Sequence, residues 1–137
     1  MKIVSACLAG INCTYRGDSN SNKKIIEMVE KGEAIPVCPE QLGGLPTPRI
    51  ASEGKENKVF NKEGKDVTLE FNNGAKEALK IAKMINCKEA ILKARSPSCG
   101  CGEIYDGTFS KKLIKGDGVF TKLLKENKII VRTEEEI

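Results

Sequence analysis

Three of the six cysteines in this chain follow short apolar runs, and these three residues are the first candidates for chemistry. They are Cys7, Cys38 and Cys99, the last a few residues beyond its run. If the runs are parallel strands of one sheet, their carboxyl ends meet at one edge and the thiols converge there. Three soft ligands in a crevice, with a fourth position open, indicate a reactive metal or iron-sulfur centre rather than a structural one.

The chain contains no histidine, which removes several kinds of active site at once. Ser-His-Asp triads, Cys-His nucleophile pairs and histidine-bound zinc are all excluded. A metal would have to bind thiolates or carboxylates, and thiolates select iron-sulfur clusters, zinc or copper(I). The wide spacing of the three cysteines matches no local zinc-finger or ferredoxin pattern. Only the fold can therefore bring them together.

Two residues near these cysteines could take part in acid-base chemistry. Glu40 follows Cys38 by two residues, and Ser96 places a hydroxyl on the loop that carries Cys99. A general acid or base must reach the reacting group, and Glu40 is the nearest ionisable side chain that could do so. The alternatives, a solvated Glu40 and a turn-forming Ser96, stay open from the local sequence.

A segment rich in glycine and proline, residues 43–49, could approach a ligand. Gly44 would allow the backbone to come close, and Arg49 could bind a carbonyl or an anion. The segment is not a phosphate-binding P-loop, because the Lys-Ser/Thr ending is missing. Gly44 and Arg49 are candidate substrate-binding residues.

The other three cysteines are harder to assign. Cys13 and Cys101 lie in glycine-containing loops near a stronger candidate, and each could be a spare ligand, a sulfur acceptor or incidental. Cys87 ends an amphipathic pattern, where packing at a helix terminus is its expected role.

The elements that must position these residues alternate between short apolar runs and helical patterns, which is typical of an α/β domain built on a parallel sheet. The expected strands cover residues 2–6, 34–37, 89–94 and 128–132, and the expected helices cover 22–31, 68–86 and 118–127. We therefore predict a single Rossmann-like domain over residues 1–137, with a mostly parallel sheet, flanking helices and ligands at the strand carboxyl ends.

A long loop is expected over residues 40–65, with a short hairpin near Val59 and Phe60. The segment holds two prolines and several glycines. A structureless loop of that length in a compact domain is unusual unless it is functional. We expect it to cover the strand carboxyl ends, with Asp66 or Thr68 capping the helix that follows.

The bulk composition is that of an ordinary soluble domain. The chain has 137 residues, of which 39% are hydrophobic and 31% charged, and its net charge is +4. Lysines alternate with glutamates, which favours a solvated surface over a nucleic-acid interface. No signal peptide or membrane-spanning run is visible, so we expect a cytoplasmic protein in which cysteines serve as ligands or catalysts rather than disulfides. The oligomeric state is not predicted.

Several motifs, taken in chain order, resemble those of the thiouracil desulfidase family. They are residues 5–10 (SACLAG), 13–17 (CTYRG), 37–40 (VCPE), 43–49 (GGLPTPR), 92–100 (LKARSPSCG) and 104–109 (IYDGTF). The likeness runs over essentially the whole chain, and several of the motifs are long enough to be specific.

The resemblance implies a [4Fe-4S] cluster held by Cys7, Cys38 and Cys99, with one iron not ligated by protein. It also implies that Glu40 and Ser96 form the acid-base pair. In such an enzyme the sulfur of a thiolated nucleobase binds the open iron and water attacks the carbon, so that sulfide is released. A soft thiocarbonyl sulfur prefers iron to water, which makes an open iron a suitable Lewis acid.

Two other functions are compatible with the residues. In one, the protein is an interaction domain in which four cysteines, with Cys13 or Cys101 as the fourth, hold zinc or a cluster. In the other, it is a metal-free thiol or persulfide carrier that uses Cys99 and Cys101. The metal content of the purified protein would distinguish these from the desulfidase.

Overall fold

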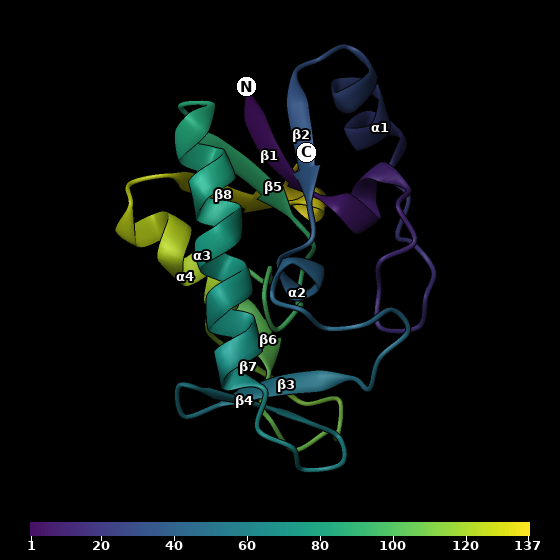
Figure 1. Cartoon of the computed structure of the whole chain (residues 1–137), viewed down its shortest axis with the longest axis vertical. Coiled ribbons are helices and arrows are strands. Elements are labelled where there is room, and N and C mark those ends of the chain that lie inside the picture. The colour runs from purple at the N-terminus through teal and green to yellow at the C-terminus, as the bar shows by residue number, and fades with distance from the viewer.

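Four parallel strands form the central sheet of the computed structural model, which describes all 137 residues (Figure 1). The strand order is β2-β1-β5-β8. The strands are β1 (Lys2–Ser5), β2 (Ala34–Val37), β5 (Glu89–Leu92) and β8 (Ile130–Thr133). The predicted α/β class and the four predicted strands are confirmed, with ends that differ by one or two residues.

Helices cover both faces of this sheet, as Figure 1 shows. Helices α3 (Thr68–Met84) and α4 (Val119–Glu126) pack on one face with Ile3 and Leu92. Helix α1 (Lys23–Glu30) and the short helix η1 (Ala6–Ala9) pack on the other face with Val4 and Ile91. Because both faces are buried at the two central strands, Ile3 and Val4 of β1 and residues 90–92 of β5 form continuous apolar runs instead of alternating with polar residues.

The order of connections reverses between β1 and β5. From β1 the chain passes through α1 to the neighbouring strand β2, then through α3 back past β1 to β5. Ile3 is therefore paired with Ile35 on one side and with Ala90 on the other. Open parallel sheets bind ligands outside the carboxyl ends of the strands at such a reversal.

The helix boundaries follow local signals. Asn22 caps α1 by accepting hydrogen bonds from two backbone N–H groups, and Gly32 follows the end of α1 in the left-handed conformation. At the start of α3 the capping position is occupied by Val67, while the side chain of Asp66 accepts a hydrogen bond from the Thr68 N–H at 2.9 Å. No helix has the length and apolar character that a bilayer crossing needs.

The expected long loop holds more structure than predicted. It contains the short helix α2 (Pro39–Leu42) and a hairpin of β3 (Ser52–Lys55) and β4 (Lys58–Asn61), which is the hairpin expected near Val59 and Phe60. A second hairpin, β6 (Glu103–Tyr105) with β7 (Leu113–Lys115), was not predicted, because each strand has only three residues and is too short to show a periodic pattern. A turn of 3-10 helix, η2 (Glu134–Glu136), ends the chain.

Helix α2 touches α3 backbone to backbone at two glycines. A Cβ atom on Gly43 would lie 2.0 Å from the Glu70 carbonyl oxygen, and one on Gly74 would lie 1.8 Å from the Pro39 carbonyl oxygen. Only residues without side chains permit this approach. The two glycines therefore fix how deeply α2 sits against α3.

Candidate functional site

The three predicted ligands meet at the carboxyl end of the sheet. Cys7 lies in η1 just after β1, Cys38 is the residue before α2 just after β2, and Cys99 lies in the loop that follows β5. All three line one cavity of about 390 Å³. Cys7 and Cys38 are half-buried, and Cys99 is buried. The structure thus brings together the three thiols that the strand pattern singled out.

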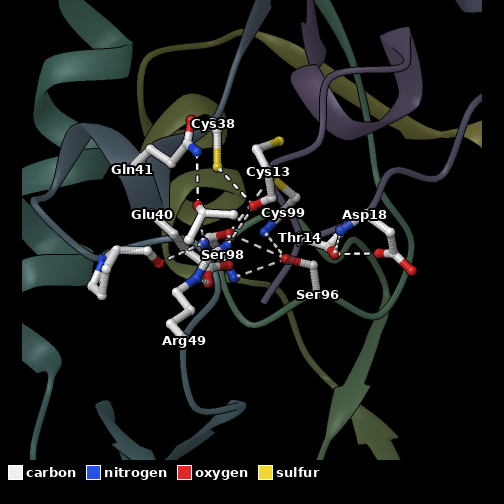
Figure 2. A network of polar contacts seen from close by, with 12 residues as sticks. Cys13, Thr14, Asp18, Cys38, Glu40, Gln41, Arg49, Ser96, Ser98 and Cys99 are labelled. Atoms are coloured by element: carbon white, nitrogen blue, oxygen red, sulfur yellow. Dashed lines mark hydrogen bonds and ion pairs between the residues drawn. The ribbon is translucent and has the colours of Figure 1, made fainter. Parts of the chain in front are cut away.

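The predicted acid-base residues line the same cavity. Glu40 lies in the first turn of α2, and its Oε1 accepts a hydrogen bond from Arg49 Nε at 3.0 Å. Its Oε2 accepts a hydrogen bond from the Ser98 hydroxyl at 2.9 Å. The hydroxyl of Ser96 lies 3.1 Å from that of Ser98, so Ser98 bridges the two predicted residues (Figure 2).

A tight turn fixes the loop that carries Ser96 and Cys99. The Ser96 hydroxyl oxygen accepts backbone hydrogen bonds from Ser98 (3.2 Å) and Cys99 (3.0 Å). The Ser96 carbonyl accepts a third hydrogen bond from the Gly100 N–H at 2.8 Å, and a Cβ on Gly100 would lie only 2.7 Å from that same oxygen. Thr121 of α4 donates its hydroxyl to the Cys99 carbonyl at 2.9 Å. The Cys99 backbone is therefore held from both sides.

The thiols differ in their readiness to ionise. The Cys13 thiol lies beside those of Cys7 and Cys38, and the Cys38 thiol donates to the Cys13 carbonyl at 3.8 Å. The neighbouring Cys13 thiol lowers the pKa of Cys38 to about 7 and lowers that of Cys7, although burial opposes both shifts. The same neighbours, chiefly Cys38, raise the pKa of Cys13, so Cys13 is the least acidic of these three thiols.

Burial has the opposite effect at Cys99. Removal from solvent raises the pKa of Cys99 to about 12, and the neighbouring hydroxyls of Ser5 and Ser98 only partly offset this. A bound metal deprotonates a coordinating thiol outright, so burial does not prevent Cys99 from acting as a ligand. Burial limits the access of solvent to this position.

Arg49 is already committed to protein partners. Besides Glu40, its guanidinium donates to the Pro46 carbonyl (3.2 Å), the Thr47 hydroxyl (3.1 Å) and the Cys13 carbonyl (2.8 Å). Its side chain is 7% exposed and that of Glu40 is 13% exposed. Arg49 lines the cavity while it holds the Glu40 carboxylate and the Cys13 loop in place.

Gly44, the other candidate for substrate contact, is not among the residues that line the cavity. Its backbone is in the left-handed conformation at φ +91°, and a Cβ there would meet nothing within 4 Å. Its substrate-binding role stays a prediction. The role that the conformation supports is in the turn that follows α2.

The remaining cysteines separate into two groups. Cys13 is buried at the same cavity as the three predicted ligands. Cys101 does not line that cavity, and its Sγ lies 3.6 Å from the carbonyl oxygen of Val131 on β8. Cys87 packs in the core beyond the end of α3, as predicted. Cys13 is thus the one additional thiol near the site.

Ser98 is the site residue that sequence reasoning missed. It lies beside Cys99 within residues 92–100, but nothing in the sequence shows that it faces Glu40, because that contact joins residues 58 positions apart. The rest of the cavity wall also comes from distant segments. Among these wall residues are Tyr15, Glu53, Lys93 and Tyr105.

The family model for 2-thiouracil desulfurase matches residues 3–136. The chain belongs to the 2-thiouracil desulfurase family. A solved structure described as the [4Fe-4S]-dependent thiouracil desulfidase TudS is 40% identical and superposes with a TM-score of 0.94, covering 98% of this chain and 91% of that one. The uncharacterized protein YbbK of Bacillus subtilis (strain 168) is 43% identical, over 100% of this chain and 97% of its own length.

The donor set of this desulfurase family member suits an iron-sulfur cluster. No three His, Cys, Asp or Glu side chains surround a single point at metal-ligand distance. The thiols are instead distributed around a cavity, and a cluster presents several irons, each of which takes its own thiolate. Soft sulfur donors without any histidine are the ligands that such clusters prefer. Cys7, Cys38 and Cys99 therefore fit the group.

Proposed function

We propose that this protein is a [4Fe-4S]-dependent desulfidase that removes sulfur from a thiolated pyrimidine, such as 2-thiouracil, or from a related thioamide. One observation carries the proposal: three thiols from three different strand ends line the same cavity as Glu40 and Ser96. Family membership and the likeness to TudS support it.

Cys7, Cys38 and Cys99 would hold the cluster and leave one of its irons without a protein ligand. Such an iron, when bound, supplies a Lewis acid for a soft thiocarbonyl sulfur. Cys13 is the residue that could close this position. Its raised pKa and its position beside Cys7 and Cys38 favour a supporting role.

The reaction exchanges sulfur for oxygen and needs no oxidant or reductant. Water adds its oxygen to the thiocarbonyl carbon, the carbon-sulfur bond breaks, and the two protons of water leave with sulfur as hydrogen sulfide. Glu40 would accept a proton from this water, which is supported by the position of its carboxylate at the cavity wall and by the hydrogen bond that orients it, from Arg49. The Ser96 hydroxyl supplies a second polar group for orienting the water or the substrate.

Anaerobic purification followed by metal analysis and turnover tests this proposal. We expect a brown protein with about four irons and four labile sulfides per chain. With 2-thiouracil it should release sulfide and uracil in equal amounts. Cys101→Ser is the matched control, because this thiol lies outside the cavity, and it should retain both iron and turnover.

Other results of the same measurement would contradict the proposal. Stoichiometric zinc without turnover would indicate a structural site. Its fourth ligand would then be Cys13, which lines the cavity, rather than Cys101, which does not. An active but metal-free thiol would indicate a sulfur carrier. A cluster-loaded protein inactive toward thiolated pyrimidines and thioamides would retain the cofactor assignment and remove the substrate class.

A further inference from the structure

A hydroxyl with no assigned role lies between the two proposed acid-base residues. Ser98 is 2% exposed, and its Oγ lies 2.9 Å from Glu40 Oε2 and 3.1 Å from Ser96 Oγ (Figure 2). Glu40 and Ser96 have no direct hydrogen bond to each other. Ser98 is their shared partner.

The direction of these hydrogen bonds follows from what each group can donate. A carboxylate only accepts, so the single Ser98 hydroxyl proton is used in the bond to Glu40. The Ser98 oxygen is then the acceptor for the hydroxyl of Ser96. The Ser96 oxygen in turn accepts the backbone N–H groups of Ser98 and Cys99. Each group in this chain has one defined orientation.

The other oxygen of Glu40 is fixed as well. Arg49, in the loop after α2, donates to Oε1, and Ser98, in the loop after β5, donates to Oε2. The carboxylate is therefore held at both oxygens. Without Ser98, Oε2 would lose its only hydrogen bond, and Glu40 could turn about the bond to Arg49. A displacement of about 1 Å at a reacting group can cost on the order of 100-fold in rate.

We infer that Ser98 is a positioning residue that holds Glu40 and Ser96 in one fixed relative arrangement. The inference rests on the proposed desulfidase function. It assigns no contact with substrate to Ser98, which acts through its two neighbours. A competing role is support of the ligand Cys99, whose Sγ lies 3.7 Å from the same hydroxyl.

Four variants of the anaerobically purified protein separate these roles: Ser98→Ala, Ser98→Thr, Thr121→Val and the double variant Ser98→Ala with Glu40→Gln. For Ser98→Ala we expect kcat on 2-thiouracil to fall about 10- to 100-fold, with KM within about twofold of wild type and iron content unchanged. Ser98→Thr keeps the hydroxyl and should recover most of the loss. Thr121→Val removes a buried hydroxyl that holds the same loop through the Cys99 carbonyl, so it should lower the melting temperature and leave kcat within about threefold.

The double variant distinguishes positioning from general loop damage. If Ser98 acts through Glu40, adding Ser98→Ala to the Glu40→Gln variant should lower kcat by less than about threefold more, because the two substitutions remove the same contribution. Fully multiplicative losses would overturn the inference. So would wild-type kcat in Ser98→Ala, or loss of iron from Ser98→Ala, which would instead assign the hydroxyl to Cys99.

A readout without turnover completes the test. A crystal structure of Ser98→Ala should show the Glu40 carboxylate rotated away from the position that it has in wild type, whereas an unchanged carboxylate would overturn the inference. If Ser98→Ala does not fold, Ser98→Thr decides: iron-loaded protein with near-wild-type kcat supports the inference, and a loss as large as 100-fold overturns it. An inactive wild-type protein would instead show that the proposed function has failed.

Discussion

The cavity has two walls that differ in how tightly they are packed. The sheet wall is formed at the carboxyl ends of β1, β2 and β5, and the hairpin wall is formed by the β3–β4 and β6–β7 hairpins. The sheet side is backed by a core of 13 buried residues between the strands and the α3–α4 layer. The buried cluster under the β3–β4 hairpin has three residues: Val59 of β4, with Val67 and Phe71 at the start of α3. The thiols come from the sheet side, whereas Glu53 and Tyr105 come from the hairpins. The chemistry is thus placed on the part of the molecule that packing holds most firmly.

Polar contacts join the hairpins to each other where packing does not. Glu53 of β3 accepts backbone hydrogen bonds from Gly107 (3.0 Å) and Phe109 (3.1 Å), which lie between β6 and β7. Such bonds open locally at lower free energy than a packed core does. We therefore expect the hairpin wall to open locally at lower free energy than the sheet wall.

The largest effect that this comparison predicts is at a ligand on the sheet wall. Cys38→Ser should lose both iron and turnover, because a hydroxyl replaces one of three thiolates. Iron content and sulfide release in anaerobic preparations measure this. Cys87→Ser, a thiol in the core away from the cavity, is the control and should keep its iron. A Cys38→Ser protein with full iron content would remove Cys38 from the ligand set.

The second prediction concerns the proposed acid-base residues, which should affect turnover without affecting iron binding. Glu40→Gln should keep its iron and lose about 100- to 10,000-fold in kcat, the range typical of general acid-base groups. Ser96→Ala should also keep its iron and lose turnover. Glu126→Gln, an exposed carboxyl at the end of α4, is the matched control. Retained turnover in Glu40→Gln would exclude Glu40 from the mechanism.

A third prediction compares one substitution on both walls. Leu92→Ala in β5 removes a fully buried side chain and should lower the free energy of unfolding by about 2–5 kcal/mol. Leu113→Ala in β7 removes a side chain that is 39% exposed and should change it by about 0.5 kcal/mol or less. Denaturant titration of both variants measures the contrast. Equal losses would show that the two walls are equally well packed.

The smallest expected effect is at the polar link between the hairpins. Glu53→Ala leaves the Gly107 and Phe109 N–H groups without their acceptor and should cost about 1 kcal/mol. Faster amide hydrogen exchange at these two positions, with unchanged exchange in β1 and β5, would locate the loss. Glu56→Ala, in the exposed turn of the same hairpin, should leave exchange unaltered. Faster exchange throughout the sheet would mean that the hairpins stabilise the whole domain.

The sheet wall could be predicted from the sequence because its signals are local. Short apolar runs gave the four strands, and the spacing of Phe71, Ala75 and Ala82 gave α3, all three of which are buried. Once these strands are placed in parallel, their order of connection brings Cys7, Cys38 and Cys99 to one edge. The grouping of the thiols therefore followed from strand direction alone.

The hairpin wall and the hydrogen bonds of the site could not be predicted in the same way. Residues of β7 are all exposed and show no periodic burial, so no pattern distinguishes the strand from a loop. The contact of Ser98 with Glu40 depends on the relative position of α2 and the loop after β5. The sequence predicts that Arg49 binds a carbonyl or an anion, but not that its Nε donates to Glu40; its contact with substrate stays a prediction.

The close approach of Gly43 to Glu70 and of Gly74 to Pro39 links the cavity to α3, because Pro39 lines the cavity whereas Gly74 does not. A methyl group added at Gly74 would meet the Pro39 carbonyl and displace α2, which would move Glu40 and the adjacent Cys38 relative to Cys7 and Cys99. The proposed acid-base residue and the proposed ligands would then lose their relative positions although none of them had been altered. A substitution at this contact between α2 and α3 could separate cofactor loading from turnover.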